Sequence, residues 1–260
     1  MDYEHIQVER GGEIATVTFN RPHKANAVNS AHLLEIEHAA LSFRDDVDTR
    51  VVIFTGAGKH FNSGADLTDR EPRQDLIQWR RRARLGERCI RALTAMDQIT
   101  IAAWNGAAMG GGACIATALD FRIGERECFM SYPEINIGVN LMWQSLPLIV
   151  HLVGPARAKQ LVISGERVYA PTLFAWGALD EMVERGELMP TARRWAERYA
   201  AKAPIAAQMI KRSVNAISSA LDQSIMHMDF DQNLQTVMSD DATEAVSAYL
   251  GNRKPSFKGN

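Results

Sequence analysis

The sequence lacks the long apolar runs and the excess of one charge that mark several classes of protein. No window approaches the roughly 18 uninterrupted apolar residues of a membrane span, and the first residues show no basic start followed by an apolar core. We therefore expect a soluble, unexported, cytoplasmic protein that does not bind membranes. The net charge is only −2, so overall charge also predicts no nucleic-acid binding.

Cysteine is scarce, and its spacing is not that of a zinc site. Cys89, Cys114 and Cys128 are an odd number of thiols, which is typical of free, buried cysteines in a reducing cytosol. The seven histidines are scattered, without a His-x-x-x-His pair or a surrounding carboxylate cluster. The sequence therefore predicts no metal site.

Complete nucleotide-binding motifs are also missing. The stretch "TGAGKHF" ends at Phe61, but a phosphate loop would need glycine at Ile53 and serine or threonine at His60. A dinucleotide fingerprint would need glycine where Phe61 stands. Neither motif is present.

The first two thirds of the chain alternate strand-like and helix-like segments. Short apolar or β-branched runs are typical of buried strands, and the segments between them fit helices. Ser30 is the expected N-cap of one helix, and residues 73–96 have room for a longer one. This alternation predicts an α/β architecture. The expected strands span residues 14–19, 51–55, 99–104, 121–124 and 128–131.

From about Thr191 onward the pattern changes to long helical stretches without a strand-like run. We expect a core over residues 1–190 and a helical region over residues 191–260. The apolar residues of this region exceed what a short helical arm can bury on itself, which predicts docking on another surface such as another subunit. They are Ile205, Met209, Ile225, Met226, Met228, Leu234, Val237 and Met238.

Two glycine-bearing stretches lie where a strand should pass into a helix. They are "FNSGADL" at residues 61–67 and "NGAAMGGGACIA" at residues 105–116. The first amides of a helix are unpaired and lie at the positive end of its dipole, so glycines there leave N–H groups free to reach a ligand oxygen. Two such turns facing each other would form an oxyanion hole. The alternative is close packing of helix and strand without a ligand.

Five segments, in order over nearly the whole chain, carry a family resemblance: "NRPHKANAVN" at 20–29, "AGKHFNSGADL" at 57–67, "NGAAMGGGACIA" at 105–116, "YPEINIGV" at 132–139 and "RKPSFKG" at 253–259. They resemble the enoyl-CoA hydratase/isomerase (crotonase) superfamily. The resemblance implies a spiral of ββα units, a C-terminal helical region that mediates trimerisation, and an acyl-CoA thioester as substrate. The assembly would be a homotrimer or a dimer of trimers. Coenzyme A would be part of the substrate, with no separate cofactor.

The resemblance also assigns roles to residues. The N–H groups of Ala65 and Gly111 would form an oxyanion hole that stabilises a thioester enolate, and Glu134 would be the acid/base group that moves the α-proton. Phe257 and Lys258 would reach in from a neighbouring subunit. The implied substrate-binding residues are His23, Ala25, Ser63, Asp66, Leu67, Gly112, Pro133, Asn140, Phe257 and Lys258.

The chain departs from the hydratase pattern at one decisive position. Hydratases of this superfamily carry a second glutamate two residues past the triple glycine, where this chain has Cys114. A thiol of ordinary pKa is a poor replacement for a carboxylate that positions water. Moving a double bond from position 3 to position 2 needs only one base, so Glu134 alone favours isomerisation of an enoyl-CoA. The bulky residues Leu141, Met142 and Trp143 would narrow or reshape the acyl pocket.

Other interpretations stay open at this point. The chain could be a hydratase or dehydratase that uses Glu134 alone, a non-catalytic relative that binds acyl-CoA or RNA, or a hydrolase that acts through Cys114. The arginine-rich stretch at residues 80–91 could contact phosphates or form the solvated face of a helix. Asn140 and Gln144 could hold a polar group of the substrate or make structural contacts.

Overall fold

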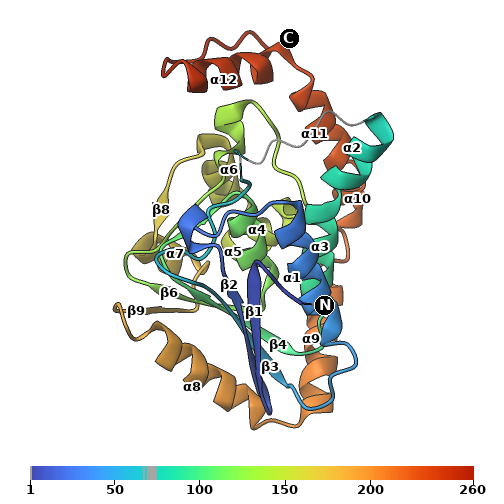
Figure 1. Cartoon of the computed structure of the whole chain (residues 1–260), viewed down its shortest axis with the longest axis vertical. Helices are drawn as coiled ribbons and strands as arrows, with labels where there is room; N and C mark the ends of the chain where they lie inside the picture. Colours follow the sequence, from blue (N-terminus) through green and yellow to red (C-terminus); the bar gives the residue numbers. More distant parts are fainter. Residues whose placement is uncertain (1, 67, 69–74) are drawn as a thin grey trace.

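A six-stranded sheet forms the centre of the protein, and helices surround it (Figure 1). The structure is a computed structural model that describes residues 2–66, 68 and 75–260. The strand order is β1-β2-β3-β4-β6-β9; β1 pairs antiparallel with β2, and the other pairs are parallel. The strands are β1 (Ile6–Gly11), β2 (Ile14–Phe19), β3 (Val51–Gly56), β4 (Ile99–Trp104), β6 (Phe121–Glu125) and β9 (Glu181–Val183).

Both faces of this sheet are covered, which explains why β3 is buried along its whole length. Val52 and Phe54 belong to a core shared with α1 (Ser30–Ser42), α3 (Leu85–Thr94) and α4 (Gly111–Ala118). Val51 and Ile53 point to the opposite face, toward α8 (Leu188–Ala200). Successive side chains of a strand alternate between faces, so a strand between two layers is apolar throughout. The expected α/β architecture is confirmed, and its main sheet is parallel except for β1.

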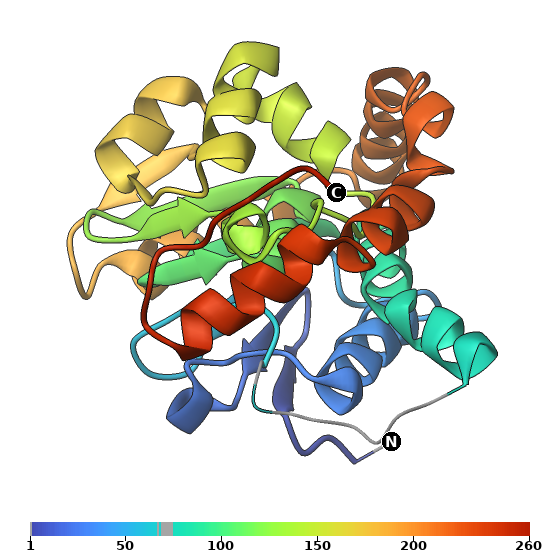
Figure 2. The same cartoon turned by 90° about the horizontal axis from the view of Figure 1, so that it is seen from above.

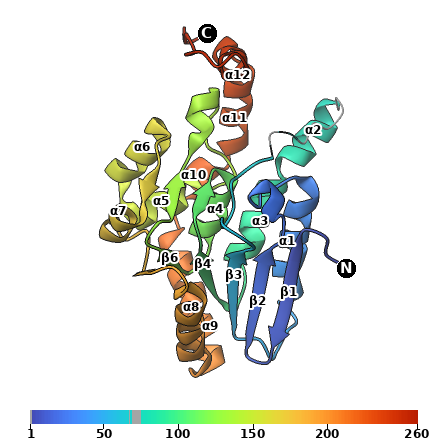
Figure 3. The same ribbon diagram turned by 60° about the vertical axis from the view of Figure 1, so that its left-hand side comes forward.

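A second, three-stranded sheet of β5, β7 and β8 lies beside the first. Figure 3 shows strands β1 to β4 side by side, with α11 and α12 at one end of the molecule and α8 and α9 at the other. The remaining elements are β5 (Ala107–Met109), β7 (Phe129–Ser131), β8 (Val168–Tyr169), α2 (Leu76–Ala83), α5 (Leu146–Val153), α6 (Pro155–Ser164), α7 (Ala170–Trp176), α9 (Pro204–Ser218), α10 (Gln223–Met226), α11 (Asp229–Val237), α12 (Asp240–Leu250) and the 3₁₀ helices η1 (Pro22–Lys24) and η2 (Pro133–Ile137).

Two local predictions are wrong. Asn29, not Ser30, caps α1, because the Asn29 side chain accepts a hydrogen bond from the His32 N–H at 2.9 Å. The long helix expected up to Met96 is two helices, α2 and α3, which meet at Arg84. Within the described part of the chain, no helix is both long and apolar enough to cross a bilayer.

The C-terminal helices contact the core through a buried ion pair. Lys211 of α9 is buried, and its ammonium lies 2.7 Å from a carboxylate oxygen of Asp120 and 2.6 Å from the Gln98 carbonyl oxygen. The expected boundary at residues 190 and 191 falls inside α8, whose Ala192 and Ala196 pack against the sheet. Helix α8 is therefore part of the core, while the division into two regions stays a prediction.

Helix α9 leaves one apolar side in solvent. Met209, Ile210 and Val214 are 62%, 63% and 56% exposed. Figure 2 shows the C-terminal helices gathered along one side of the molecule and across its front. An apolar face of this kind is typical of a surface that another subunit covers, so the homotrimer stays a prediction that this surface supports.

Substitution on this face should dissociate the assembly. Ile210→Asp with Val214→Asp places two charges one helical turn apart on the exposed side of α9, where burial against a subunit would be costly. We expect sedimentation velocity to show an oligomer for the wild type and a smaller folded species for the double variant. Gln160→Asp, at an exposed polar position of α6, should leave the oligomer intact. A wild type that sediments as a monomer at micromolar concentration would contradict the prediction.

Candidate active site

The first glycine turn is joined to β5 by the backbone of Asn62. The Asn62 N–H donates to the Ala107 carbonyl at 3.0 Å, and the Met109 N–H donates to the Asn62 carbonyl at 3.0 Å. The Asn62 side chain also accepts a hydrogen bond from the Gly64 N–H at 2.9 Å. These bonds hold the turn after β3 against the strand that leads into α4.

Gly64 lets this turn approach the start of α4 closely. Its φ of +87° lies in the left-handed region that favours glycine. A Cβ at Gly64 would lie 2.7 Å from the Met109 carbonyl oxygen and 3.5 Å from the Gly111 nitrogen. No side chain fits there, so the backbone of the first turn runs directly beside the first amide of α4.

Two N–H groups remain unpaired where the turns meet. The Val28 N–H donates to the Gly64 carbonyl and the Asp66 N–H donates to the Val28 carbonyl, which leaves the Ala65 N–H between them without an acceptor. Gly111 is the first residue of α4, so its N–H has no helical acceptor. Neither N–H donates to any other described residue. Both donors belong to segments that meet where the Gly64 turn approaches the first residue of α4.

Glu134 approaches the same place from η2. A Cβ at Gly110 would lie 2.8 Å from Oε1 of Glu134, so the glycine makes room for the carboxylate. The other carboxylate oxygen, Oε2, is buried and has no hydrogen-bond partner among the described residues. Burial raises the pKa of Glu134 from its ordinary 4.5 to about 7, because the charged form loses its hydration. A carboxyl with this pKa can take up and release a proton near neutral pH.

Cys114 lies one turn into α4 and is buried. Burial raises the pKa of its thiol well above the usual value, the charge of Glu134 raises it further, and a hydrogen bond with Ser145 opposes both effects. The thiol is therefore neutral at physiological pH and a poor nucleophile. This chemistry does not support a hydrolase that acts through Cys114.

The indole of Trp143 fills the space beside Gly111. A Cβ at Gly111 would lie 2.4 Å from Cζ3 of this ring, and a Cβ at Gly86 in α3 would lie 1.9 Å from Cε2. The ring therefore sits between α3 and the first turn of α4. The sequence predicted a bulky wall from residues 141–143, and the structure assigns the part next to Gly111 to Trp143.

Asp229 of α11 is a carboxylate near the site that the sequence did not indicate. It is buried and accepts a hydrogen bond from the Gln144 N–H at 2.9 Å. Burial raises the pKa of Asp229 to about 6, while the N–H groups of Gln144 and Trp143 oppose this shift. No motif surrounds Asp229, so only the fold reveals its position.

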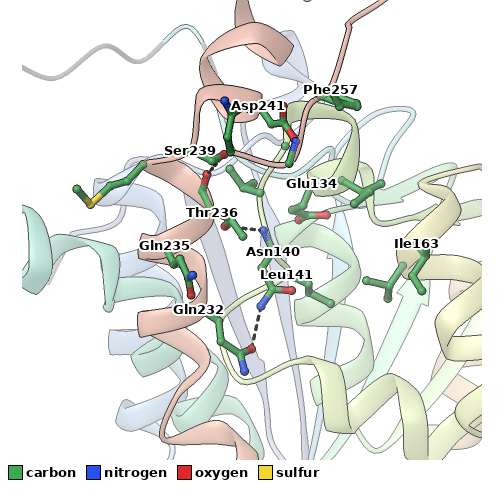
Figure 4. Close-up of a pocket in the computed structure, with 17 residues that line it drawn as sticks. Glu134, Asn140, Leu141, Ile163, Gln232, Gln235, Thr236, Ser239, Asp241 and Phe257 are labelled. Carbon is green, nitrogen blue, oxygen red and sulfur yellow. Dashed lines mark hydrogen bonds between the residues drawn. The ribbon is translucent and has the colours of Figure 1, made fainter.

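The segment from Asn140 to Gln144 follows Glu134, and its two polar residues, Asn140 and Gln144, make structural contacts with neighbouring helices. The Asn140 side chain donates to Gln232 at 3.1 Å and its N–H donates to the Thr236 hydroxyl at 3.0 Å (Figure 4). The Gln144 side chain donates to Glu87 and accepts from Arg91. The segment is thereby held between α3 and α11, and a substrate contact of Asn140 stays a prediction.

A pocket of about 990 Å³ opens beside Glu134. Leu141, Ile163 and Phe257 contribute to its walls (Figure 4). The C-terminal tail folds back along α12, because the N–H groups of Lys258 and Gly259 donate to Asp241 at 2.7 and 2.9 Å. Phe257 therefore lines the pocket of its own chain, and the contact of the tail with a neighbouring subunit that the resemblance implies stays a prediction.

Four of the other predicted binding residues gather around the first turn. The Ser63 N–H donates to the Ala25 carbonyl at 3.1 Å, and His23 lies in the adjacent η1. Hydrogen bonds from Thr68 and then the Arg21 guanidinium lower the pKa of Asp66 to about 2, so Asp66 is charged.

Two of the remaining predicted binding residues, Gly112 and Pro133, lie in other elements. Gly112 packs on Asn62, because a Cβ there would lie 2.2 Å from the Asn62 carbonyl oxygen. Pro133 is the first residue of η2. Leu67 lies outside the described residues.

One arginine of the arginine-rich stretch forms an ion pair with α1, and contacts of this stretch with phosphates stay a prediction. Arg88 pairs with Glu37 at 2.6 Å on the flank of α1. Over residues 2–66, 68 and 75–260, no group of three or more histidine, cysteine, aspartate or glutamate side chains is arranged to hold a metal ion.

Comparison with known proteins identifies the family. A sequence model described as "Enoyl-CoA hydratase/isomerase" matches residues 9–260. The chain is 32% identical to crotonyl-CoA hydratase of Syntrophomonas wolfei, over 99% of both chains, and 30% identical to short-chain-enoyl-CoA hydratase of Clostridium acetobutylicum, over 98% of this chain and 97% of that one. Its fold is similar to the crystal structure of an enoyl-CoA hydratase from Bacillus anthracis, with a TM-score of 0.78 at 29% identity over 99% of this chain and all of that one.

The raised pKa of Glu134 should make stability depend on pH. A carboxyl whose pKa is higher in the folded protein favours folding when protonated, so its contribution declines as pH rises from 4.5 to about 7. Glu134→Gln stays neutral, and above pH 7 its free energy of unfolding should exceed that of the wild type by up to about 3 kcal/mol. Urea denaturation at pH 5 and pH 8 measures this difference. Glu127→Gln, at an exposed carboxylate, should show no such gain, and an equal gain in both variants would contradict the assignment.

Proposed function

Since the chain belongs to the enoyl-CoA hydratase/isomerase family, we propose that it isomerises the double bond of an enoyl-CoA, with Glu134 as the single proton shuttle. The observation that carries this proposal is the chemistry around Gly110. A carboxyl with a pKa of about 7 lies against this residue. The position where hydratases of the superfamily carry a second glutamate holds the buried, neutral thiol of Cys114.

The two free amides supply the electrostatic part of the reaction. The thioester oxygen of the substrate would accept hydrogen bonds from the N–H groups of Ala65 and Gly111, which stabilise the negative charge that develops on that oxygen as an enolate forms. The carboxylate of Glu134 would remove a proton from C2 and return it at C4. One base is enough because both carbons lie on the same conjugated enolate.

The coenzyme A part of the substrate would lie along the cluster of His23, Ala25, Ser63 and Asp66. This cluster adjoins Ala65, so a thioester that reaches the oxyanion hole passes it. Phe257 and Lys258 of the tail would contact the substrate from the side of the pocket beside Glu134. The site needs no cofactor other than the coenzyme A of the substrate, and the active assembly would be a homotrimer or a dimer of trimers.

Hydration of a 2-enoyl-CoA is the second candidate. The curated relatives that are 30% and 32% identical to this chain are named as hydratases. In this chain the reaction would require Glu134 alone to position and activate water, because the Cys114 thiol is not a base at neutral pH. The two reactions share the substrate class and the oxyanion hole, and they differ in the fate of a 2-enoyl thioester.

The role of the Gly111 N–H can be isolated with two variants. Gly111→Ala and Gly111→Pro both add a Cβ next to Trp143, but only proline removes the N–H donor, and proline is well tolerated as the first residue of a helix. We expect Gly111→Pro to be about 10²-fold slower than Gly111→Ala in turnover of enoyl-CoA. Circular dichroism checks that both variants fold. Equal rates in folded variants would show that this amide is not part of the oxyanion hole.

Glu134→Gln should separate binding from chemistry. The amide keeps the shape of the side chain but cannot accept a proton, so isomerisation of a 3-enoyl-CoA should fall by at least ~10²-fold while acyl-CoA binding, measured by calorimetry, persists. The wild type is also supplied with a 2-enoyl-CoA, and formation of the 3-hydroxy product is followed. Efficient hydration would replace the isomerase proposal with the second candidate.

A further inference from the structure

We propose that Trp143 sets the length of the acyl chain, and that its indole restricts the enzyme to short-chain thioesters. This inference rests on the proposed function, because it concerns the acyl group of the substrate held at the same oxyanion hole. Three features support it: the position of the Trp143 ring, the contacts that fix its backbone, and the space that remains for the acyl chain.

The ring occupies the space next to one of the two free donors. Its Cζ3 and Cη2 atoms would lie 2.4 and 2.5 Å from a Cβ at Gly111, and its Cε2, Cδ2 and Nε1 atoms would lie 1.9 to 2.2 Å from a Cβ at Gly86. Such distances are far below van der Waals contact, so the absence of a side chain at both glycines is what admits the indole. The ring fills the gap between α3 and the first turn of α4.

The backbone under the ring is held in an unfavourable conformation. Trp143 and Gln144 have φ values of +70° and +57°, in the left-handed region that residues with a Cβ seldom adopt. The carboxylate of Asp229 accepts the Gln144 N–H at 2.9 Å, and the Gln144 side chain bridges Glu87 and Arg91 of α3. Contacts to α3 and α11 thus fix this turn from two sides, and a fixed turn gives the ring little freedom to move aside.

These features determine how much room the acyl chain has. Consider a thioester whose oxygen accepts a hydrogen bond from the Gly111 N–H. The carboxyl of Glu134, next to Gly110, then lies on one side of it, and the indole of Trp143, next to Gly111, lies on the other. The carbons nearest the thioester fit between them, whereas a longer chain meets the ring. The pocket beside Glu134 is the other direction that a long chain could take, and Ile163, which is 64% exposed, lines it.

The experiment compares kcat/KM for 3-enoyl-CoA thioesters of four, eight and twelve carbons. We expect the wild type to prefer the shortest chain. Trp143→Ala should reduce the preference for four over twelve carbons by at least about tenfold, because removing the indole opens space for several methylene groups, and Trp143→Phe should have an intermediate effect. Ile163→Ala should leave the preference within about twofold of wild type.

A second measurement keeps the test valid if Trp143→Ala does not fold. Trp143→Leu keeps an apolar side chain in the space next to Gly86 and Gly111 but removes the ring, so it should relax the preference for four over twelve carbons more than Trp143→Phe does. An unchanged length preference in folded Trp143→Phe and Trp143→Leu would overturn the inference. A change in Ile163→Ala alone would also overturn it and would place the chain in the pocket beside Glu134.

Binding of saturated acyl-CoA thioesters of the same lengths separates this inference from the proposed function. Saturated thioesters cannot react, so their affinities report chain length without turnover. If the wild type binds the short saturated thioester more tightly than the long one, and the Trp143 variants reduce this difference in affinity, the inference is supported even without turnover of an enoyl-CoA. A lack of turnover would reject the isomerase proposal alone. Wild-type affinities that do not depend on length would reject the inference alone.

Discussion

The candidate site depends on the pairing of Asn62 with strand β5. This pairing joins the turn after β3 to the strand that precedes α4, and it brings the turn that contains Ala65 to the start of α4, where Gly111 lies. Gly112 then packs directly on the Asn62 carbonyl. The two donors therefore come from backbone that the sheets and α4 hold in place, and such fixed dipoles need little reorganisation when charge develops on a ligand.

Burial governs the ionisable groups around these donors. Glu134, Cys114 and Asp229 all have raised pKa values, and loss of hydration is the largest cause for each. The outcome differs because the ordinary pKa values differ: a carboxyl is brought near neutrality, whereas a thiol is moved out of the physiological range. One environment thus brings the pKa of Glu134 near neutrality and keeps the Cys114 thiol protonated, and this difference supports the proposed proton transfer by Glu134.

Local patterns predicted most of the framework. The apolar runs of β2, β3, β4 and β6 are readable because strands between two layers are apolar along their length, and the glycine turns are readable because close backbone approach excludes side chains. The break at Arg84 was missed, since nothing in the arginine-rich stretch disfavours a continuous helix. Asp229 could not be found, because its contact with Gln144 joins distant segments and neither has a motif. The position of the Trp143 ring likewise depends on a glycine in another helix.

The contact between Gly86 and Trp143 also has a consequence for how the family can diverge. The indole of Trp143 occupies the space that a side chain at Gly86 would fill, so the ring fits only because residue 86 is glycine. A larger residue at the first position requires a smaller one at the second, so single changes pass through a clash or a void, both of which are unfavourable in a packed interior. Relatives should therefore vary at these two positions together, and each matched pair would mark a lineage with its own choice of substrate size.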